Sequence, residues 1–265
     1  MQNTERIELI VFDWAGTITD FGGIAPFMVF DKVFSAQGIH LTKEEINKPM
    51  GMEKKDHIRT LLQTSTASKQ WEQQFGRGWT EKDVDALYET FEEALYSVVT
   101  EYSGLIPGVA QTVETLKQMD IKIGSTTGYT SQMMKQVIPR AKKEGYHPDY
   151  VVTPDMIGCG RPSPFMVYEN MRKFNIYPPS HVVKVGDTVV DILEGKNAGA
   201  WSVGILTGSN LMGLSKEETQ SLPEAELKKR KEEATRVYLE AGADFVLDTI
   251  SELPEAIRRI NQQMA

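Results

Sequence analysis

Short apolar runs rich in β-branched residues recur along the chain and alternate with segments of helical periodicity. Apolar runs of this length are typical of strands buried on both faces of a parallel sheet. The segments between most of them have helix signals, such as the Ser-Pro start of 163–174. This alternation predicts an α/β fold with a doubly wound, mostly parallel Rossmann-like sheet. The expected strands lie in 7–12, 121–126, 149–153, 181–187, 201–206 and 243–248.

One long segment, residues 21–103, interrupts this alternation. A helix is expected in 27–38, and a Thr-x-x-Glu capping box at Thr42 predicts a second helix. Residues 81–99 place apolar side chains at helical spacing over a long stretch. The segment shows no strand pattern, so it is expected to be an all-helical insert. The predicted domains are an α/β core of residues 1–20 and 104–265 and a helical domain of residues 21–103.

The amino-acid composition limits which binding partners and which cell compartment are expected. The net charge is −8, with 37 acidic and 29 basic residues, whereas nucleic-acid binding needs basic patches. The single cysteine, Cys159, leaves no disulfide within the chain, as is usual in a reducing cytosol. No apolar stretch has the length of a membrane span, and no signal-peptide core precedes the first strand. A cytoplasmic protein without nucleic-acid or membrane partners is therefore expected.

Polar side chains recur where the expected strands end. Asp13 follows the first run, Thr127 follows the second, and Arg161 lies in the loop after the third. Asp187 and Asp191 follow the fourth. Each of these residues alone is commonly a turn, cap or solvated residue. Because ligands bind outside the carboxyl ends of the strands in open α/β sheets, their ordered recurrence predicts a shared site at that edge.

The four strand-end segments, "DWAGT", "STTG", "GRPSP" and "GDTVVD", resemble the four motifs of the haloacid dehalogenase superfamily of phosphotransferases and hydrolases. The helical insert resembles the cap domain of one branch of that superfamily, so the likeness spans nearly the whole chain. It implies that Asp13 attacks phosphorus and forms an aspartyl-phosphate, which divides one hard displacement into two easier ones. It also implies that Thr127 and Arg161 hold the phosphoryl oxygens, Arg161 as a permanent cation.

The same resemblance implies a Mg²⁺ site. Its ligands would be Asp13, the backbone carbonyl of Ala15, and Asp187, with Asp191 in a supporting position. Mg²⁺ prefers hard oxygen ligands and keeps several waters, so a few protein ligands suffice. The cation would neutralise charge between two anions that otherwise repel.

Ala15 departs from the phosphomonoesterases of the superfamily, which keep an aspartate two residues after the nucleophile. That acid protonates a departing alkoxide and then activates water. Its absence is compatible with an inactive protein, with a dehalogenase, or with a leaving group that is not oxygen. The dehalogenase branch works without metal and lacks the "GDxxxD" pattern, which this chain retains. The intact metal motif also argues against an inactive protein.

The segment "KPMGMEKKDHIRTLL", residues 48–62, resembles the cap segment of the phosphonoacetaldehyde hydrolase (phosphonatase) family, as does "DWAGT". Cleaving a carbon–phosphorus bond expels a carbanion, which needs an electron sink. A lysine that condenses with an aldehyde makes an iminium that accepts those electrons. The resemblance places this Schiff base on Lys54 and makes an acid at position 15 unnecessary for bond cleavage. A small residue there also leaves room for the lysine.

Helical spacing independently favours Lys54 over its neighbour. If residues 48–62 are helical, Met50, Lys54, His57 and Leu61 share one face. Lys55 falls on another face and is expected to be solvated. Lys54 must be neutral to attack a carbonyl, so burial and nearby positive charge, to which Lys55 could contribute, are expected to lower its pKa.

Other residues of the site rest mainly on the resemblance. His57 could relay a proton, together with Tyr129, during Schiff-base formation, or could simply pack in the cap. Met50 and Gly51 are expected to line the pocket, with Gly51 allowing a close backbone approach or acting at a hinge. If Lys54 is on the cap and the nucleophile on the core, the site is complete only when the domains close.

The sequence thus predicts an enzyme that uses Mg²⁺ to hydrolyse the carbon–phosphorus bond of phosphonoacetaldehyde to acetaldehyde and phosphate. The alternatives are a phosphomonoesterase or dehalogenase of the same superfamily, or a non-catalytic binding protein. The expected hinges are residues 20–24 and 100–106. The resemblance also implies a homodimer, in which the apolar stretch 26–30 could supply a contact or could be cap core.

Overall fold

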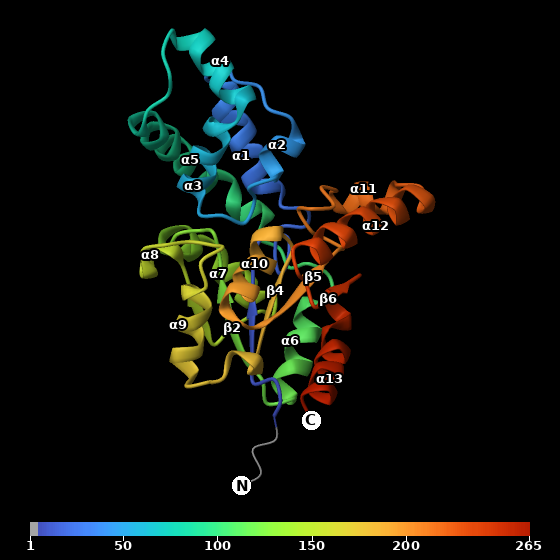
Figure 1. Ribbon diagram of the computed structural model, residues 1–265. Helices are drawn as coiled ribbons and strands as arrows, with labels where there is room; N and C mark the ends of the chain where they lie inside the picture. The colour runs from blue at the N-terminus through green and yellow to red at the C-terminus, as the bar shows by residue number, and fades with distance from the viewer. Residues whose placement is uncertain (1–4) are drawn as a thin grey trace.

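The computed structural model describes residues 5–265 and contains a six-stranded sheet in the order β3-β2-β1-β4-β5-β6 (Figure 1). Every neighbouring pair of strands is parallel. Each apolar run identified in the sequence contains one strand, so the predicted α/β class is confirmed. The strands are β1 (Leu9–Phe12), β2 (Lys122–Thr126), β3 (Tyr150–Val152), β4 (Val182–Gly186), β5 (Trp201–Ile205) and β6 (Phe245–Leu247).

Helices cover both faces of this sheet because alternate strand residues point to opposite sides. Ile10 of β1 belongs to the main hydrophobic core together with Leu116 of α6 and Ile257 of α13. Leu9 packs in a second cluster with Val167 of α9. The sheet is therefore doubly wound. Its helices are α6 (Val109–Gln118), α7 (Ser131–Lys143), α8 (Pro154–Ile157), α9 (Phe165–Phe174), α10 (Val189–Ala198), α11 (Lys216–Ser221), α12 (Glu224–Glu240) and α13 (Leu253–Met264), with 3₁₀ turns at Pro179–His181 and Ile250–Glu252.

Five helices gather beyond the carboxyl ends of the strands, at the top of Figure 1. Between Ile24 and Tyr102 the structure has no strand. These helices occupy most of the predicted insert, whose boundaries at residues 21 and 103 stay a prediction. They are α1 (Ile24–Ser35), α2 (Lys43–Asn47), α3 (Lys54–Gln63), α4 (Ser65–Phe75) and α5 (Glu81–Tyr102).

The first cap helix starts earlier than its sequence pattern suggests. The carboxylate of Asp20 accepts hydrogen bonds from the backbone N–H groups of Ile24 and Ala25, and a carboxylate in this position stabilises a helix start. The expected capping box at Thr42 is present, with the Glu45 carboxylate accepting from the Thr42 backbone N–H at 2.9 Å.

The segment 48–62 is only partly helical. Helix α3 begins at Lys54, and the side chain of Glu53 caps it by accepting from the Asp56 backbone N–H at 3.1 Å. Gly51 has φ +91°, a left-handed conformation that a continuous helix does not contain. The expected placement of Met50 on the helix is therefore wrong. Its sulfur still lies 4.0 Å from the Lys54 Nζ.

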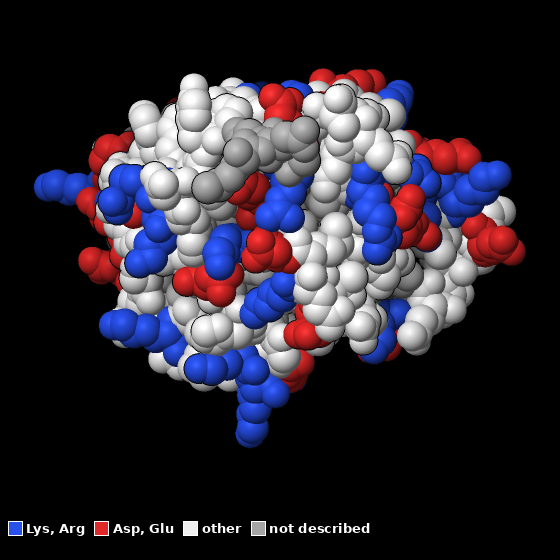
Figure 2. All heavy atoms as spheres, turned by 90° about the horizontal axis from the view of Figure 1, so that it is seen from below, with Lys and Arg blue, Asp and Glu red and all other residues white. Residues whose placement is uncertain are grey.

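The face at the end opposite the cap carries charges of both signs (Figure 2). Seen from the end opposite the cap, acidic and basic side chains are interspersed (Figure 2). Within residues 5–265, no helix combines the length and the apolar character that a membrane crossing requires.

Candidate active site

A small cavity lies where the cap meets the carboxyl ends of the strands. Its volume is about 20 Å³, which is room for about one water molecule. Cap and core both line it, so the structure shows a closed arrangement. The lining residues are Asp13, Ala15, Gly23, Pro26, Met50, Gly51, Lys54, Thr127, Gly128, Tyr129, Arg161 and Thr188.

The turn after β1 presents Asp13 to this cavity. The Asp13 backbone N–H still donates to Val185 O at 2.9 Å, which extends the β1–β4 pairing. Gly16 then adopts φ +88°, and a Cβ there would lie 2.0 Å from Asp187 Oδ2. The turn therefore requires glycine, since any side chain would collide with the second carboxylate.

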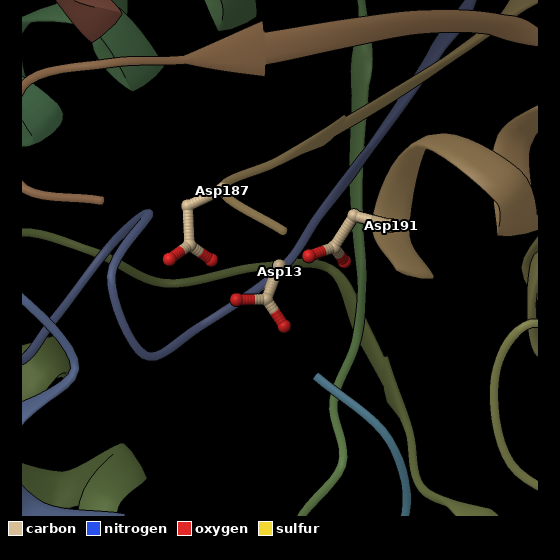
Figure 3. Close-up of side chains that lie close together, drawn as sticks. All are labelled: Asp13, Asp187 and Asp191. Carbon is tan, nitrogen blue, oxygen red and sulfur yellow. The ribbon is translucent and has the colours of Figure 1, made fainter. Parts of the chain in front are cut away.

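Three buried carboxylates converge at this point (Figure 3). Oxygen atoms of Asp13, Asp187 and Asp191 all lie within 4.8 Å of one another. Asp187 accepts from Asn210 N at 2.7 Å and from Thr17 Oγ1 at 3.2 Å. Within residues 5–265 no lysine or arginine forms an ion pair with it. Burial, followed by the neighbouring negative charges, raises the pKa of Asp187 well above its usual value.

Arg161 is buried beside the nucleophile candidate. Its Nη1 donates to Asp13 Oδ1 at 2.5 Å, and its Nη2 donates to Thr126 Oγ1 at 2.8 Å. Burial alone would lower the pKa of Arg161, but the surrounding carboxylates, led by Asp13, raise it above its ordinary value. The side chain therefore brings a fixed positive charge to the cavity.

Asp191 points to other protein groups as well as to the cluster. Its Oδ1 accepts from Lys184 Nζ at 2.8 Å and lies 2.9 Å from Arg161 Nη1. Its Oδ2 accepts from Thr188 Oγ1 at 2.6 Å, as part of the capping box that starts α10. The contacts of Asp191 are those of a residue that holds neighbouring side chains in place.

Lys54, at the first turn of α3, lines the same cavity as Asp13 and is only 4% exposed. Its Nζ lies 5.3 Å from the centre of the Tyr129 ring and 5.9 Å from that of Phe30. Burial, against the opposing effect of Asp13 and with help from the Arg161 charge, lowers the pKa of Lys54 to about 8. A sizeable fraction of the amine is therefore neutral near physiological pH.

The expected contribution of Lys55 to this effect is not seen. Its Nζ pairs with Asp85 Oδ1 at 2.6 Å on the outer side of the cap. The positive charge that acts on Lys54 belongs to Arg161, on the core.

Glycines allow the cap segment 51–53 to press against the core. A Cβ on Gly128 would lie 2.4 Å from Met52 O, and one on Gly160 would lie 2.8 Å from Glu53 Cβ. On the cap side, a Cβ on Gly51 would lie 2.4 Å from Thr188 Oγ1. The close approach expected of Gly51 is thus present, and it is shared by two glycines of the core.

His57 lies outside the group that lines the cavity. Its Nε2 is 2.9 Å from Ile46 O, and its ring packs 3.9 Å from the Phe30 ring. Burial and then the charge of Lys54 lower the pKa of His57 well below its usual value. Its proposed relay with Tyr129 stays a prediction. Tyr129 itself lines the cavity, and its backbone N–H donates to Thr127 Oγ1 at 3.1 Å.

The structure adds residues that motif reading did not identify. Thr126 and Glu194 contact Arg161 directly, and Lys184 contacts Asp191. Lys184 carried a signal in the sequence, because a lysine inside an apolar buried strand needs a partner of opposite charge. Glu194 had a weaker signal, an acid three residues after Asp191 in the middle of the same helix.

Comparisons with known proteins agree with this geometry. The family model described as haloacid dehalogenase-like hydrolase matches residues 7–199. The phosphonoacetaldehyde hydrolase of Bacillus cytotoxicus is 46% identical over 97% of this chain and 98% of its own length, and that of Bacillus cereus strain G9842 is 44% identical over the same shares. The crystal structure of a phosphonoacetaldehyde hydrolase-like protein from Oleispira antarctica superposes with a TM-score of 0.96 at 34% identity, covering 99% of this chain and 95% of that one. The chain therefore belongs to the haloacid dehalogenase-like hydrolases and, within them, to the phosphonoacetaldehyde hydrolase family.

Proposed function

We propose that this protein hydrolyses the carbon–phosphorus bond of phosphonoacetaldehyde, giving acetaldehyde and phosphate in a Mg²⁺-dependent reaction. The observation that carries the proposal is the meeting of Lys54 and Asp13 in one closed cavity, with Ala15 between core and cap. A buried amine with a pKa near 8 supplies what the missing acid at position 15 cannot, an electron sink for a departing carbon.

The proposed chemistry has two covalent stages on the protein. The neutral Lys54 amine condenses with the aldehyde, releases water and takes up a proton from solvent to give a protonated imine. A carboxylate oxygen of Asp13 attacks phosphorus, and the electron pair of the C–P bond moves into the iminium to give an enamine. Water then cleaves the aspartyl-phosphate, while protonation and hydrolysis of the enamine release acetaldehyde and regenerate Lys54.

Several cavity residues would hold the phosphoryl group. Arg161 Nη1 lies beside Asp13, and Thr127 also lines the cavity. The sulfur of Met50 and the ring of Tyr129 surround the Lys54 amine, which keeps water away from it. The cap segment at Gly51 shuts the cavity over the substrate.

The donor set fits a divalent cation. Within residues 5–265, the four buried carboxylates of Asp13, Asp187, Asp191 and Glu194 outnumber the buried side chains of Arg161, Lys184 and Lys54. The Lys54 amine, moreover, is partly neutral. Asp187 in particular has neighbours of its own sign and no cationic side chain in contact. Asp13, Asp187 and the Ala15 carbonyl would hold Mg²⁺, with Asp191 supporting. When bound, Mg²⁺ neutralises the charge between the Asp13 carboxylate and the phosphoryl group.

Two other functions remain testable on the same site. A phosphomonoesterase or dehalogenase would not need the Lys54 amine, so its turnover would survive Lys54→Ala. A non-catalytic protein would release no phosphate from any phosphonate.

The test combines two measurements on the whole protein. Borohydride added with phosphonoacetaldehyde should trap a covalent adduct on Lys54, found by peptide mass spectrometry, and phosphate release should require Mg²⁺. Lys54→Arg should abolish both, while Lys55→Arg, its matched neighbour, should leave both intact. Trapping that disappears with Lys55→Arg and persists with Lys54→Arg would overturn the assignment.

A homodimer is part of the proposal by family membership. In the stretch 26–30, Val29 and Phe30 are buried in the cap, whereas the side chain of Met28 is 44% exposed. The stretch therefore serves mainly as cap core, and Met28 is its outward-facing residue. Sedimentation equilibrium of the wild type and of Met28→Lys would test whether this side takes part in a dimer contact.

A further inference from the structure

Glu194 of α10 is a buried acid with no part in the chemistry described above. Its side chain is fully buried. A single oxygen, Oε2, accepts from Thr126 Oγ1 at 2.9 Å and from Arg161 Nε at 3.0 Å, and lies 3.3 Å from Lys184 Nζ. Burying a charge is costly unless it is paired and hydrogen-bonded. The contacts of Oε2 meet this requirement, whereas Oε1 is buried without a hydrogen-bond partner among the described residues.

These contacts fix the rotation of the Arg161 guanidinium. An arginine has donors on two edges, and here Glu194 occupies the Nε edge. The opposite end is left to donate to Asp13 through Nη1 and to Thr126 through Nη2. Thr126 donates to the same Glu194 oxygen, so it joins the two ends of the arginine. Nη1 also lies 2.9 Å from Asp191 Oδ1, so the contribution of Glu194 is to hold the Nε edge of the guanidinium.

Lys184 completes the anchor from β4. Its Nζ lies between Asp191 Oδ1, at 2.8 Å, and Glu194 Oε2, at 3.3 Å. Its stem passes over Gly195, where a Cβ would lie 2.8 Å from Lys184 Cβ. Lys184 on the strand and Arg161 thus both contact the same Glu194 oxygen.

We infer that Glu194, backed by Lys184, is a positioning residue that aims Arg161 at the phosphoryl group during transfer to Asp13. The inference rests on the proposed function. It assigns Glu194 to the phosphoryl step, because the amine that forms the Schiff base, that of Lys54, lies beside Met50 and the Tyr129 ring. Arg161 acts on that amine only through its charge. Loss of Glu194 should therefore separate the two stages of the reaction.

The experiment compares Glu194→Gln with wild type, and with Glu232→Gln as a matched control on the exposed face of α12. We expect phosphate release by Glu194→Gln to slow by about 10- to 100-fold, the range for a small misplacement of a positioning group. Borohydride trapping on Lys54, measured at pH 10, where the wild-type amine is neutral, should stay at the wild-type level. Loss of trapping together with turnover would mean general damage to the site and would overturn the inference.

A double-mutant cycle with Arg161→Lys tests whether Glu194 acts through Arg161. A lysine has no Nε edge to hold, so adding Glu194→Gln to Arg161→Lys should change phosphate release by less than about 3-fold, the non-additivity expected of coupled residues. Full additivity would overturn the inference. Glu194→Asp keeps the charge but withdraws it by one methylene, so it takes the place of Glu194→Gln if that variant does not fold. Absence of trapping and of phosphate release in the wild type would instead refute the proposed function itself.

Discussion

At the scale of single residues, Ala15 and Lys54 act as a pair. Ala15 lies in the cavity where related phosphomonoesterases have an acid, and Lys54 enters the same cavity from the cap. A carboxylate at position 15 would lie close to this amine and would favour its protonated form. The small side chain therefore has a chemical consequence as well as a steric one, because it helps to keep the amine neutral.

The pKa of Lys54 predicts the pH dependence of adduct formation. Burial lowers this pKa from 10.5 to about 8, and only the neutral amine attacks the aldehyde. The trapping rate should therefore rise about tenfold per pH unit below pH 8 and level off above it. The measurement is borohydride trapping from pH 6 to 10. A midpoint close to 10.5 would show an amine exposed to water and would contradict the buried position.

At the scale of elements, the active site depends on how the loop before α3 meets the loops after β2 and β3. Gly51, Gly128 and Gly160 all lie at the boundary between cap and core, and each lacks space for a Cβ. Helix α3 starts just after this contact, at Lys54. The contact therefore sets how deeply the lysine enters the cavity.

Gly128→Ala should hold the cap away from the core. Its Cβ would lie 2.4 Å from the Met52 backbone oxygen, a contact that only a shift of the cap segment can relieve. Phosphate release should fall about 10- to 100-fold, and the midpoint of the trapping profile should move upward from pH 8 as Lys54 gains water. Gly78→Ala is the control, since a Cβ there meets nothing within 4 Å. Wild-type turnover by Gly128→Ala would contradict the role given to this contact.

At the scale of the whole molecule, the cavity between cap and core is too small for any substrate. It holds about 20 Å³, so the cap must open for substrate to enter and for product to leave. The hinges expected at residues 20–24 and 100–106 stay a prediction. Gly22 and Gly23 both have positive φ, and the returning chain meets the outgoing one through hydrogen bonds such as Ile106 N–H to Ile18 O at 2.8 Å.

Mg²⁺ should stabilise the folded protein, because it offsets the repulsion among the buried carboxylates. At a concentration 100-fold above Kd, binding adds about 2.7 kcal/mol to the free energy of unfolding, which is about 5 °C or more in Tm for a chain of this size. Thermal unfolding with and without Mg²⁺ measures it. Asp187→Asn should lose most of this shift and, without metal, should be at least as stable as the wild type. An equal shift in both proteins would place the cation elsewhere.

Much of the fold and of the candidate site could be predicted from the sequence. The six buried strands and the helical insert follow from local periodicity, and Asp13, Thr127, Arg161 and Asp187 could be placed at one edge because parallel strands end together. Resemblance and helical spacing favour Lys54 over Lys55, and the burial of Lys54 agrees with this prediction. Such features depend on neighbours in sequence or on the direction of a strand, so a single chain is enough to find them.

Other features of the candidate site depend on the tertiary structure and could not be predicted from the sequence. The start of α1 depends on Asp20, the break at Gly51 removes Met50 from α3, and the cation that acts on Lys54 is Arg161 rather than Lys55. The contacts of Glu194 and Lys184 with Arg161 and Asp191 form only when α10 packs on β4. The physical reason is that burial, pKa and the direction of a charged side chain are set by atoms distant in sequence, which no local pattern contains.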